Sequence, residues 1–292
     1  MPKPKEKFIV SILALSGWLT VFTTAGILFI LLFESALFFK DVGIWEFITG
    51  TEWTPLFSKK EYGILPLLTA TLLTSFIALL VALPIGLSIA IYLNEYANRK
   101  FRQAIKPMLE VLASVPTVVY GFFALTIVTP FLQQFIPGLA GFNSISPGIV
   151  MGIMIIPMIS SLSEDALFAV PKSLRDASYG MGATRFQTVF RVLIPSASSG
   201  IIVSVILAIS RAIGETMIVA IAAGQQPRFT LNPLVPVETI TTYIVQVSMG
   251  DVPRDSMEYR SIFAAGIVLF ILTFVMNNIS LWLKRKYHRQ YE

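Results

Sequence analysis

Six apolar segments dominate this chain, and each is long enough to cross a lipid bilayer as a helix. They run near residues 8–33, 66–93, 108–131, 147–168, 197–222 and 261–283. A bilayer core of roughly 30 Å needs about 20 consecutive apolar residues in helical form. Lipid offers backbone groups no hydrogen-bond partners, so unbroken apolar segments of this length cross it as helices. We therefore expect an all-α, polytopic membrane protein with six transmembrane helices.

The composition agrees with a membrane protein and excludes several kinds of site. Of 292 residues, 55% are hydrophobic and 13% are charged, whereas soluble domains have about 25% charged residues. There is no cysteine, which excludes disulfides and thiol chemistry. The one histidine, His288, lies in the C-terminal tail. A zinc site that needs two histidines on one helix is therefore excluded, and we expect no metal site and no catalytic residue.

The basic residues gather on one side of the predicted membrane. Of 22 lysines and arginines, 15 fall in the two termini and in the loops 94–107 and 169–196. Cytoplasmic segments carry the excess of positive charge, so both termini are expected in the cytoplasm of a cell whose inner membrane holds the protein. The net charge of +5 is thus a topology signal and not a nucleic-acid patch. A cleaved signal peptide is the competing interpretation of residues 1–33, but its apolar run is too long.

These spans divide the chain into four parts. Residues 1–33 form a cytoplasmic tail and the first transmembrane helix, and residues 34–65 form an extracytoplasmic segment. Residues 66–283 form the main transmembrane domain, which contains the loop 169–196, and residues 284–292 form a basic cytoplasmic tail.

The external segments contain features that suggest contact with the membrane surface or with another protein. Trp45 and Trp53 lie in the first external segment and are expected to anchor it at the membrane interface. The second external segment, residues 224–260, is long enough to touch a partner. Residues 133–146 carry no charge and several turn signals, so we expect them to dip into the membrane edge.

Two charged residues stand inside the fifth span. Arg211 and Glu215 lie four residues apart within the apolar stretch 200–223, which predicts that they share one helical face. A charge at mid-membrane depth costs roughly 2.5 to 3.5 kcal/mol, and such residues usually face a water-filled path. One interpretation is a structural ion pair. The other places Arg211, Glu215 and the adjacent Ser210 and Thr216 on a substrate path.

On the second interpretation, Arg211 meets an oxyanion, because a guanidinium matches phosphate or carboxylate geometry and keeps its charge. The anion would compete with Glu215 for Arg211, and a neighbouring subunit would supply further cationic groups.

Other polar or helix-bending residues in the spans are candidates for a gate or hinge. Pro116 interrupts the third predicted span near Tyr120, and proline bends a membrane helix. Glu164 and Asp165 lie at the inner end of the fourth span; a solvated or loop-bracing pair is favoured over a cytoplasmic gate. Glu110 follows Lys106 by four residues and is interpreted as its interfacial helix partner.

The cytoplasmic loop 169–196 carries helix signals. Ser173 with Asp176, and Thr184 with Gln187, have the spacing of helix N-caps with a partner three residues on. Gly180 and Gly182 lie between them. The loop is therefore predicted to form two short helices joined by a glycine turn, the second ending before Pro195. Several apolar positions would bury against the chain's own spans or against a separate protein, namely Leu174, Ala177, Phe186, Val189 and Phe190.

This loop resembles a motif of a known family. Asp176-Ala177-Ser178, then Gly182, then Val192-Leu-Ile-Pro195 is similar to the E-A-A…G…I-x-L-P loop of permease subunits of ATP-binding-cassette importers, with aspartate for glutamate and serine for the second alanine. The resemblance implies a type I importer permease fold and a coupling helix that docks on a nucleotide-binding subunit. It assigns this coupling to Asp176, Ala177, Gly182, Ala183, Thr184 and Arg185.

Further strings resemble phosphate importer permeases of the PstC type, over about residues 50–285. They are Ser163-Glu-Asp-Ala-Leu-Phe-Ala-Val-Pro171, Gly182-Ala-Thr-Arg185, Arg211-Ala-Ile-Gly-Glu-Thr-Met217 and Val115-Pro-Thr-Val-Val-Tyr-Gly121. The resemblance implies import of inorganic phosphate. Its partners would be a second permease subunit of the PstA type, two ATPase subunits of the PstB type and an external phosphate-binding protein of the PstS type.

The energy source is expected in another chain. There is no Gly-Lys dipeptide, so no P-loop exists to hold ATP; this chain is expected to bind no cofactor, and ATP and Mg belong to the partner ATPase. Three alternatives stay open: a permease for sulfate or molybdate, an ion-coupled secondary transporter or channel, and an intramembrane hydrolase.

Overall fold

The structure, a computed structural model, describes residues 4–288, with side chains described over residues 8–283. The basic tail 284–292 predicted above therefore lies outside the described side chains. The chain is almost wholly helical, as expected, and contains only two isolated β-bridges within this range. Its elements are α1 Pro4–Asp41, α2 Ile44–Thr49, α3 Leu65–Ile91, η1 Tyr92–Tyr96, α4 Arg99–Ser114, α5 Thr117–Phe123, η2 Ala124–Val128, α6 Thr129–Gln133, α7 Ile145–Phe168, α8 Lys172–Gly180, α9 Arg185–Thr188, η3 Val189–Leu193, α10 Ile194–Ile213, α11 Met217–Ala222, α12 Ile240–Met249 and α13 Met257–His288, where η marks a π-helical turn.

Long apolar helices account for the predicted spans. In the described residues, five helices are long and apolar enough to cross a membrane, namely Phe8–Asp41, Leu65–Tyr96, Ile145–Phe168, Arg185–Ile213 and Met257–Leu283. A bent pair of helices makes a sixth if it is counted as one span. The six-span prediction is thus correct in number on that count, and the differences lie in where helices break.

The third predicted span, 108–131, is wrong as a single helix. Arg99–Ser114 and Thr117–Gln133 meet at an angle of 86°. Val115 and Pro116 both take extended backbone conformations there, because a residue before proline is pushed out of the helical region. Pro116 therefore ends one helix and begins another, and α4 becomes a separate amphipathic helix.

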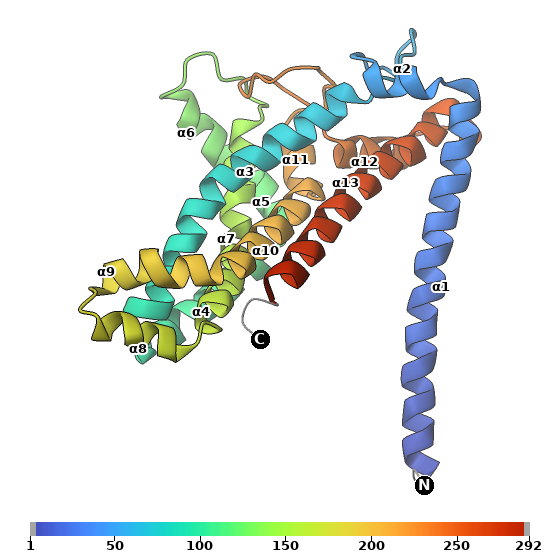
Figure 1. The fold of residues 1–292 in the computed structure, drawn as a ribbon. Coiled ribbons are helices and arrows are strands. Elements are labelled where there is room, and N and C mark those ends of the chain that lie inside the picture. The colour runs from blue at the N-terminus through green and yellow to red at the C-terminus, as the bar shows by residue number, and fades with distance from the viewer. Residues whose placement is uncertain (1–3, 289–292) are drawn as a thin grey trace.

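At the centre of the fold, α7 packs against α3 and α10 (Figure 1). Glycines allow the closest approach: a Cβ on Gly152 would lie 2.8 Å from the carbonyl oxygen of Ala78, and one on Gly148 would lie 2.7 Å from Ile77. The interior of the domain is therefore a compact contact of α3 with α7. The helix α1 stands away from this centre and touches α13, and only 11% of the most apolar part of its span is buried.

The ends of the elements sort into two groups along the long axis of the molecule (Figure 1). The start of α1 and the α8–α9 loop lie toward one end, and α2 and α6 lie toward the other.

In the first predicted external segment, Trp53 contradicts its predicted role as an interfacial anchor. Its side chain is buried and meets Phe47, Tyr62 and Tyr243 edge-on at centroid distances of 5.0 to 6.3 Å. Trp45, by contrast, is exposed. Trp53 packs in the core because aromatic side chains surround it. Residues 133–146 pair with the second external segment, through Ala140 N–H to Leu234 at 3.0 Å among other bonds.

The second helix of the cytoplasmic loop does not end before Pro195. Instead α9, η3 and α10 run on as one apolar helix, Arg185–Ile213. Pro195 lies in the first turn of α10 but within this continuous helix, so its missing N–H removes one hydrogen bond to the preceding turn. In η3, the N–H of Ile194 donates to the carbonyl of Val189, five residues back. The π turn thus carries the helix through the proline.

Candidate functional site

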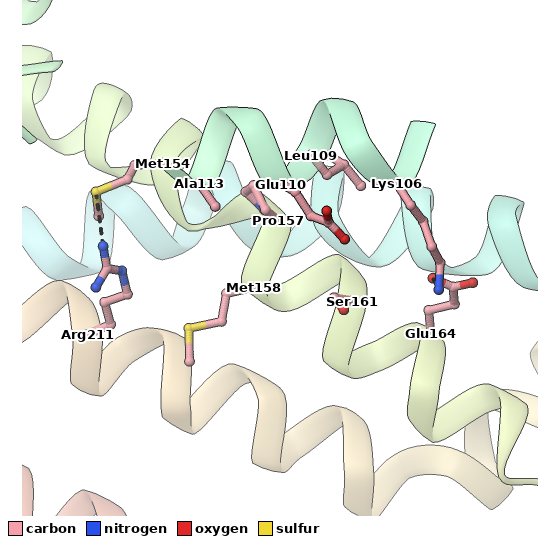
Figure 2. Close-up of a pocket in the computed structure, with 10 residues that line it drawn as sticks. All are labelled: Lys106, Leu109, Glu110, Ala113, Met154, Pro157, Met158, Ser161, Glu164 and Arg211. Carbon is pink, nitrogen blue, oxygen red and sulfur yellow. Dashed lines mark hydrogen bonds and ion pairs between the residues drawn. The ribbon is translucent and has the colours of Figure 1, made fainter. Parts of the chain in front are cut away.

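A cavity of about 440 Å³ lies between α4, α7 and α10 (Figure 2). Arg211 stands at one end, and Lys106 with Glu164 stands at the other. Its lining residues are Lys106, Leu109, Glu110, Ala113, Met154, Pro157, Met158, Ser161, Glu164 and Arg211. The cavity thus joins Arg211, the cation found within the fifth predicted span, to Lys106 and Glu164 at its other end.

Arg211 lies in the last turn of α10. The end of a helix carries partial negative charge, which stabilises a cation there. Its Nη2 donates a weak hydrogen bond to the sulfur of Met154 at 3.8 Å, and within the described residues it makes no ion pair. Its guanidinium charge therefore remains available to a ligand in the cavity.

Glu215 does not share a helical face with Arg211, so that prediction is wrong. Helix α10 ends at Ile213 with Gly214 as its cap, and Glu215 lies in the break before α11. Its Oε1 accepts hydrogen bonds from the backbone N–H groups of Met217 and Ile218 at 3.2 and 3.4 Å. The carboxylate therefore caps α11, where the positive end of the helix favours it.

The other two predicted path residues bond to backbone close by. Ser210 donates to the carbonyl of Ile206 at 2.9 Å, and Thr216 donates to that of Gly214 at 3.4 Å. Neither they nor Glu215 belong to the cavity lining. Of the four residues predicted on the path, the structure places Arg211 alone in the cavity.

Of the predicted gate residues, Glu164 has the most distinctive surroundings. Its side chain is 1% exposed, and its two carboxylate oxygens pair separately with Arg102 at 2.6 Å and Lys106 at 3.1 Å. The prediction of a solvated or loop-bracing pair with Asp165 is wrong for Glu164, because Glu164 is buried against α4 whereas Asp165 is exposed. Lys106 pairs with Glu164 and not, within the described residues, with Glu110.

Tyr120 lies on α5 beyond the break at Pro116. Its hydroxyl donates to the carbonyl of Leu112 in α4 at 2.6 Å, a carbonyl that the break leaves without a helical partner. The hydroxyl of Tyr120 thus bridges the bend between α4 and α5.

The cytoplasmic loop forms the predicted glycine turn, with one correction at its start. Thr184 and Gln187 make the reciprocal cap in full, at 2.9 and 3.3 Å. Gly182 has a φ of +80°, which glycine adopts without steric cost. Ser173 caps nothing, because α8 begins at Lys172 after Pro171 and no side-chain cap bond is made there.

Two contacts attach α8 to the rest of the protein. Arg175 pairs with Glu95 of η1 at 2.6 Å, and the hydroxyls of Ser178 and Thr188 lie 2.9 Å apart. The remaining predicted coupling residues, Asp176, Ala177, Ala183 and Arg185, lie on α8, in the turn and at the start of α9.

Most apolar side chains of the loop are left without cover. Val189 is buried, whereas Leu174, Phe186 and Phe190 are exposed, and Met181 is 88% exposed. Of the two burial partners weighed for these positions, a separate protein is the one that this exposure favours.

Sequence reasoning missed the role of α4. Arg102 was used only for topology, and Lys106 only for topology and as a partner of Glu110, although their spacing of four residues places Arg102 and Lys106 on one face of a helix. Reading α4 as part of a membrane span hid that face. It also missed Glu238, a buried residue of the second external segment, where burial raises the carboxyl pKa from 4.5 to about 8.

Comparisons with known proteins agree with this architecture. Residues 82–289 match the family described as binding-protein-dependent transport system inner membrane component. A probable ABC transporter permease protein of Bacillus subtilis, YqgH, is 36% identical over 230 residues, covering 79% of this chain and 74% of that protein. The phosphate transport system permease protein PstC of Mesorhizobium japonicum is 32% identical over 282 residues, covering 86% and 84%.

Solved structures show the same fold at lower identity. A permease chain of a bacterial ABC transporter involved in alginate import superposes with a TM-score of 0.63 at 18% identity, covering 97% of this chain and 95% of that one. A chain of the MetNI methionine ABC transporter gives 0.57 at 18% identity, covering 77% and 94%. With the fold and the match over residues 82–289 in agreement, this chain belongs to the family of binding-protein-dependent transport system inner membrane components.

Proposed function

We propose that this chain is the permease subunit of an ATP-driven importer that conducts inorganic phosphate across the cytoplasmic membrane. Several relatives that it resembles over most of their length are phosphate transport system permease proteins, among them those of Mesorhizobium japonicum and Xylella fastidiosa. The resemblance includes the string from Arg211 to Met217. Phosphate is preferred over sulfate and molybdate on these two grounds.

The observation that carries the proposal is the guanidinium of Arg211 in the cavity without an acidic partner in the described chain. A guanidinium presents a planar fork of donors that suits an oxyanion, and it stays charged at any physiological pH. Glu215 does not compete with the anion for Arg211, as the sequence suggested, because its carboxylate caps α11. One free cation binds a phosphate weakly, which suits a conduit that must release it.

Coupling to ATP is proposed through the loop 169–196. The exposed Leu174, Met181, Phe186 and Phe190 offer an apolar surface to an ATPase subunit, which would bind ATP and Mg and perform the hydrolysis. Two such ATPase subunits of the PstB type, a second permease of the PstA type and an external phosphate-binding protein of the PstS type complete the proposed importer. The binding protein would deliver phosphate to the external segments 34–65 and 224–260.

The proposed topology has both termini in the cytoplasm of the inner membrane. The start of α1 lies toward the same end of the molecule as the α8–α9 loop (Figure 1). Lys172, Arg175, Arg185 and Arg191 of that loop assign this end to the cytoplasmic side.

Reconstitution of the whole complex in proteoliposomes tests the function. Phosphate with its binding protein is expected to stimulate both ATP hydrolysis and uptake of labelled phosphate, and sulfate is expected to do so much less. The variant Arg211→Gln should lose uptake although the complex assembles normally. Arg211→Lys keeps the positive charge but not the planar donors of the guanidinium, and it should lose less uptake.

Stimulation by sulfate that exceeds stimulation by phosphate would overturn the choice of substrate. Uptake that persists without the ATPase and collapses with an ion gradient would favour a secondary transporter instead.

A further inference from the structure

We propose that Lys106 is a second oxyanion-binding position in the cavity, at its cytoplasmic end, and that Glu164 holds Lys106 in place until the anion displaces it. The inference rests on the proposed passage of an oxyanion past Arg211. It adds a position within this chain, where the sequence suggested that further cations would come from a neighbouring subunit.

The first ground is the shape of the cavity. Arg211 of α10 and Lys106 of α4 line one continuous space from opposite ends (Figure 2). Between them the wall has Met154, Pro157, Met158 and Ser161 from α7 and Glu110 from α4, and no other cation. An anion that leaves Arg211 meets little along this wall to bind it. Lys106 is the next cation that the lining offers.

The second ground is the pairing of the buried carboxylate. Glu164 uses Oε1 for Arg102 and Oε2 for Lys106. A buried carboxylate that loses its only partner is strongly destabilised. With two partners on separate oxygens, Glu164 keeps Arg102 when Lys106 turns to another anion. The exchange therefore leaves no buried charge unpaired.

The third ground is that the two cations differ in freedom. The guanidinium of Arg102 lies 5.8 Å from the ring centroid of Phe168, within the range of a cation–π contact, and Arg102 does not line the cavity. Lys106 does line it, although the two side chains are similarly exposed, at 38% for Lys106 and 33% for Arg102. A lysine ammonium is a compact charge on a flexible stem. Arg102 thus positions Glu164, and Lys106 is free to move.

The local charges keep such a site weak. Glu110 and Glu164 line the cavity with Lys106 and Arg211, so its lining is neutral and Arg102 adds a single positive charge behind it. An anion would be attracted but not retained. Weak binding at successive positions is what conduction requires.

The test compares variants in the reconstituted complex. Lys106→Gln is expected to lower uptake about tenfold or more, the effect of removing a charge-assisted hydrogen bond, and Lys106→Arg should restore most of it. Lys100→Gln is the matched control, because it removes an exposed lysine of the same helix that neither lines the cavity nor pairs with Glu164. Its uptake should fall far less than that of Lys106→Gln.

A double variant separates binding from bracing. Lys106→Gln with Glu164→Gln removes the ion pair without leaving a buried charge, so it should assemble even if Lys106→Gln alone does not. Uptake that stays low in the double variant supports the proposal. Uptake restored by the double variant would overturn it and leave a structural brace. Equal losses in Lys106→Gln and Lys100→Gln would also overturn it, because they would show a general effect of charge on this helix.

The substrate is tested separately by the wild-type complex. If wild-type complex takes up sulfate and not phosphate, the proposed function fails, and the same set of variants measured with labelled sulfate still decides the role of Lys106.

Discussion

Glu215 illustrates how a charge inside a membrane span can serve the backbone. Its carboxylate accepts from Met217 and Ile218 at the start of α11, and its own carbonyl accepts from the hydroxyl of Thr241 at 2.8 Å. The break at Gly214 exposes N–H groups that lipid cannot satisfy. The carboxylate accepts hydrogen bonds from two of them, and these bonds offset part of the free-energy cost of placing its charge inside a membrane span.

Removing this cap should destabilise the protein in a graded way. Glu215→Ala is expected to lower the free energy of unfolding by about 1 kcal/mol, as loss of a helix cap does. Glu215→Gln keeps an acceptor oxygen and should lose clearly less. Thermal unfolding of the detergent-solubilised protein measures both. Equal losses in the two variants would mean that the negative charge, and not hydrogen-bond acceptance, is what matters at this position.

At the scale of elements, hydropathy located the helices but not their breaks. Residues 115–116 and 214–216 interrupt stretches that remain apolar on both sides, and hydropathy is blind to backbone geometry. The positions of the prolines did not predict the breaks either, because Pro84 and Pro157 lie inside continuous helices whereas Pro116 separates two helices. The outcome depends on tertiary partners such as Tyr120, which no local pattern contains.

Local motifs with their own hydrogen bonds were predicted better. The cap made by Thr184 and Gln187, and the turn at Gly182, depend only on residues a few positions apart. The cavity was predictable only through Arg211, because Lys106 and Glu164 are 58 residues apart in the numbering and meet through the packing of α4 on α7. A contact of that kind has no signature in a single sequence.

The turn at Gly182 should be sensitive to a single methyl group. No atom lies within 4 Å of a Cβ built on Gly182, so Gly182→Ala adds backbone strain alone, worth about 1 kcal/mol. If docking needs this turn, the affinity for the ATPase subunit should fall about fivefold. Gly180→Ala is the control, since Gly180 also has open space around it but no positive φ. Titration of labelled ATPase subunit onto the reconstituted permease measures both, and equal affinities would contradict the expectation.

For the whole molecule, stability is concentrated in the contact of α3 with α7. A Cβ on Gly152 would lie 2.8 Å from both the carbonyl oxygen of Ala78 and the Cβ of Val81. In α1, by contrast, a Cβ on Gly26 would meet nothing within 4 Å. The two helices therefore have different roles: one builds the core, and the other offers its surface to lipid or to another subunit.

The same substitution at these two glycines should give opposite results. Gly152→Ala forces α3 and α7 apart and should lower the free energy of unfolding by about 1 to 3 kcal/mol. Gly26→Ala should be neutral or slightly stabilising, because alanine favours a helix by up to about 1 kcal/mol over glycine. Melting temperatures in detergent compare them. A Gly26→Ala variant that melts as early as Gly152→Ala would show that α1 is held as tightly as the core.

The π turn Val189–Leu193 bears on how chains of this kind can change in length. A π turn holds one more residue than the α-helical turn it replaces, and helix continues on both sides of it, through α9 and α10. Deleting one residue here would let the α register close without breaking the helix. Because the π turn already absorbs the extra residue, the cytoplasmic loop would keep nearly its present orientation relative to Arg211. The same deletion in the regular part of α10 would turn the loop by about 100°, the rotation of one residue in an α-helix. The π turn is therefore the place in this helix where the chain can lose one residue while the surfaces on both sides of it stay aligned.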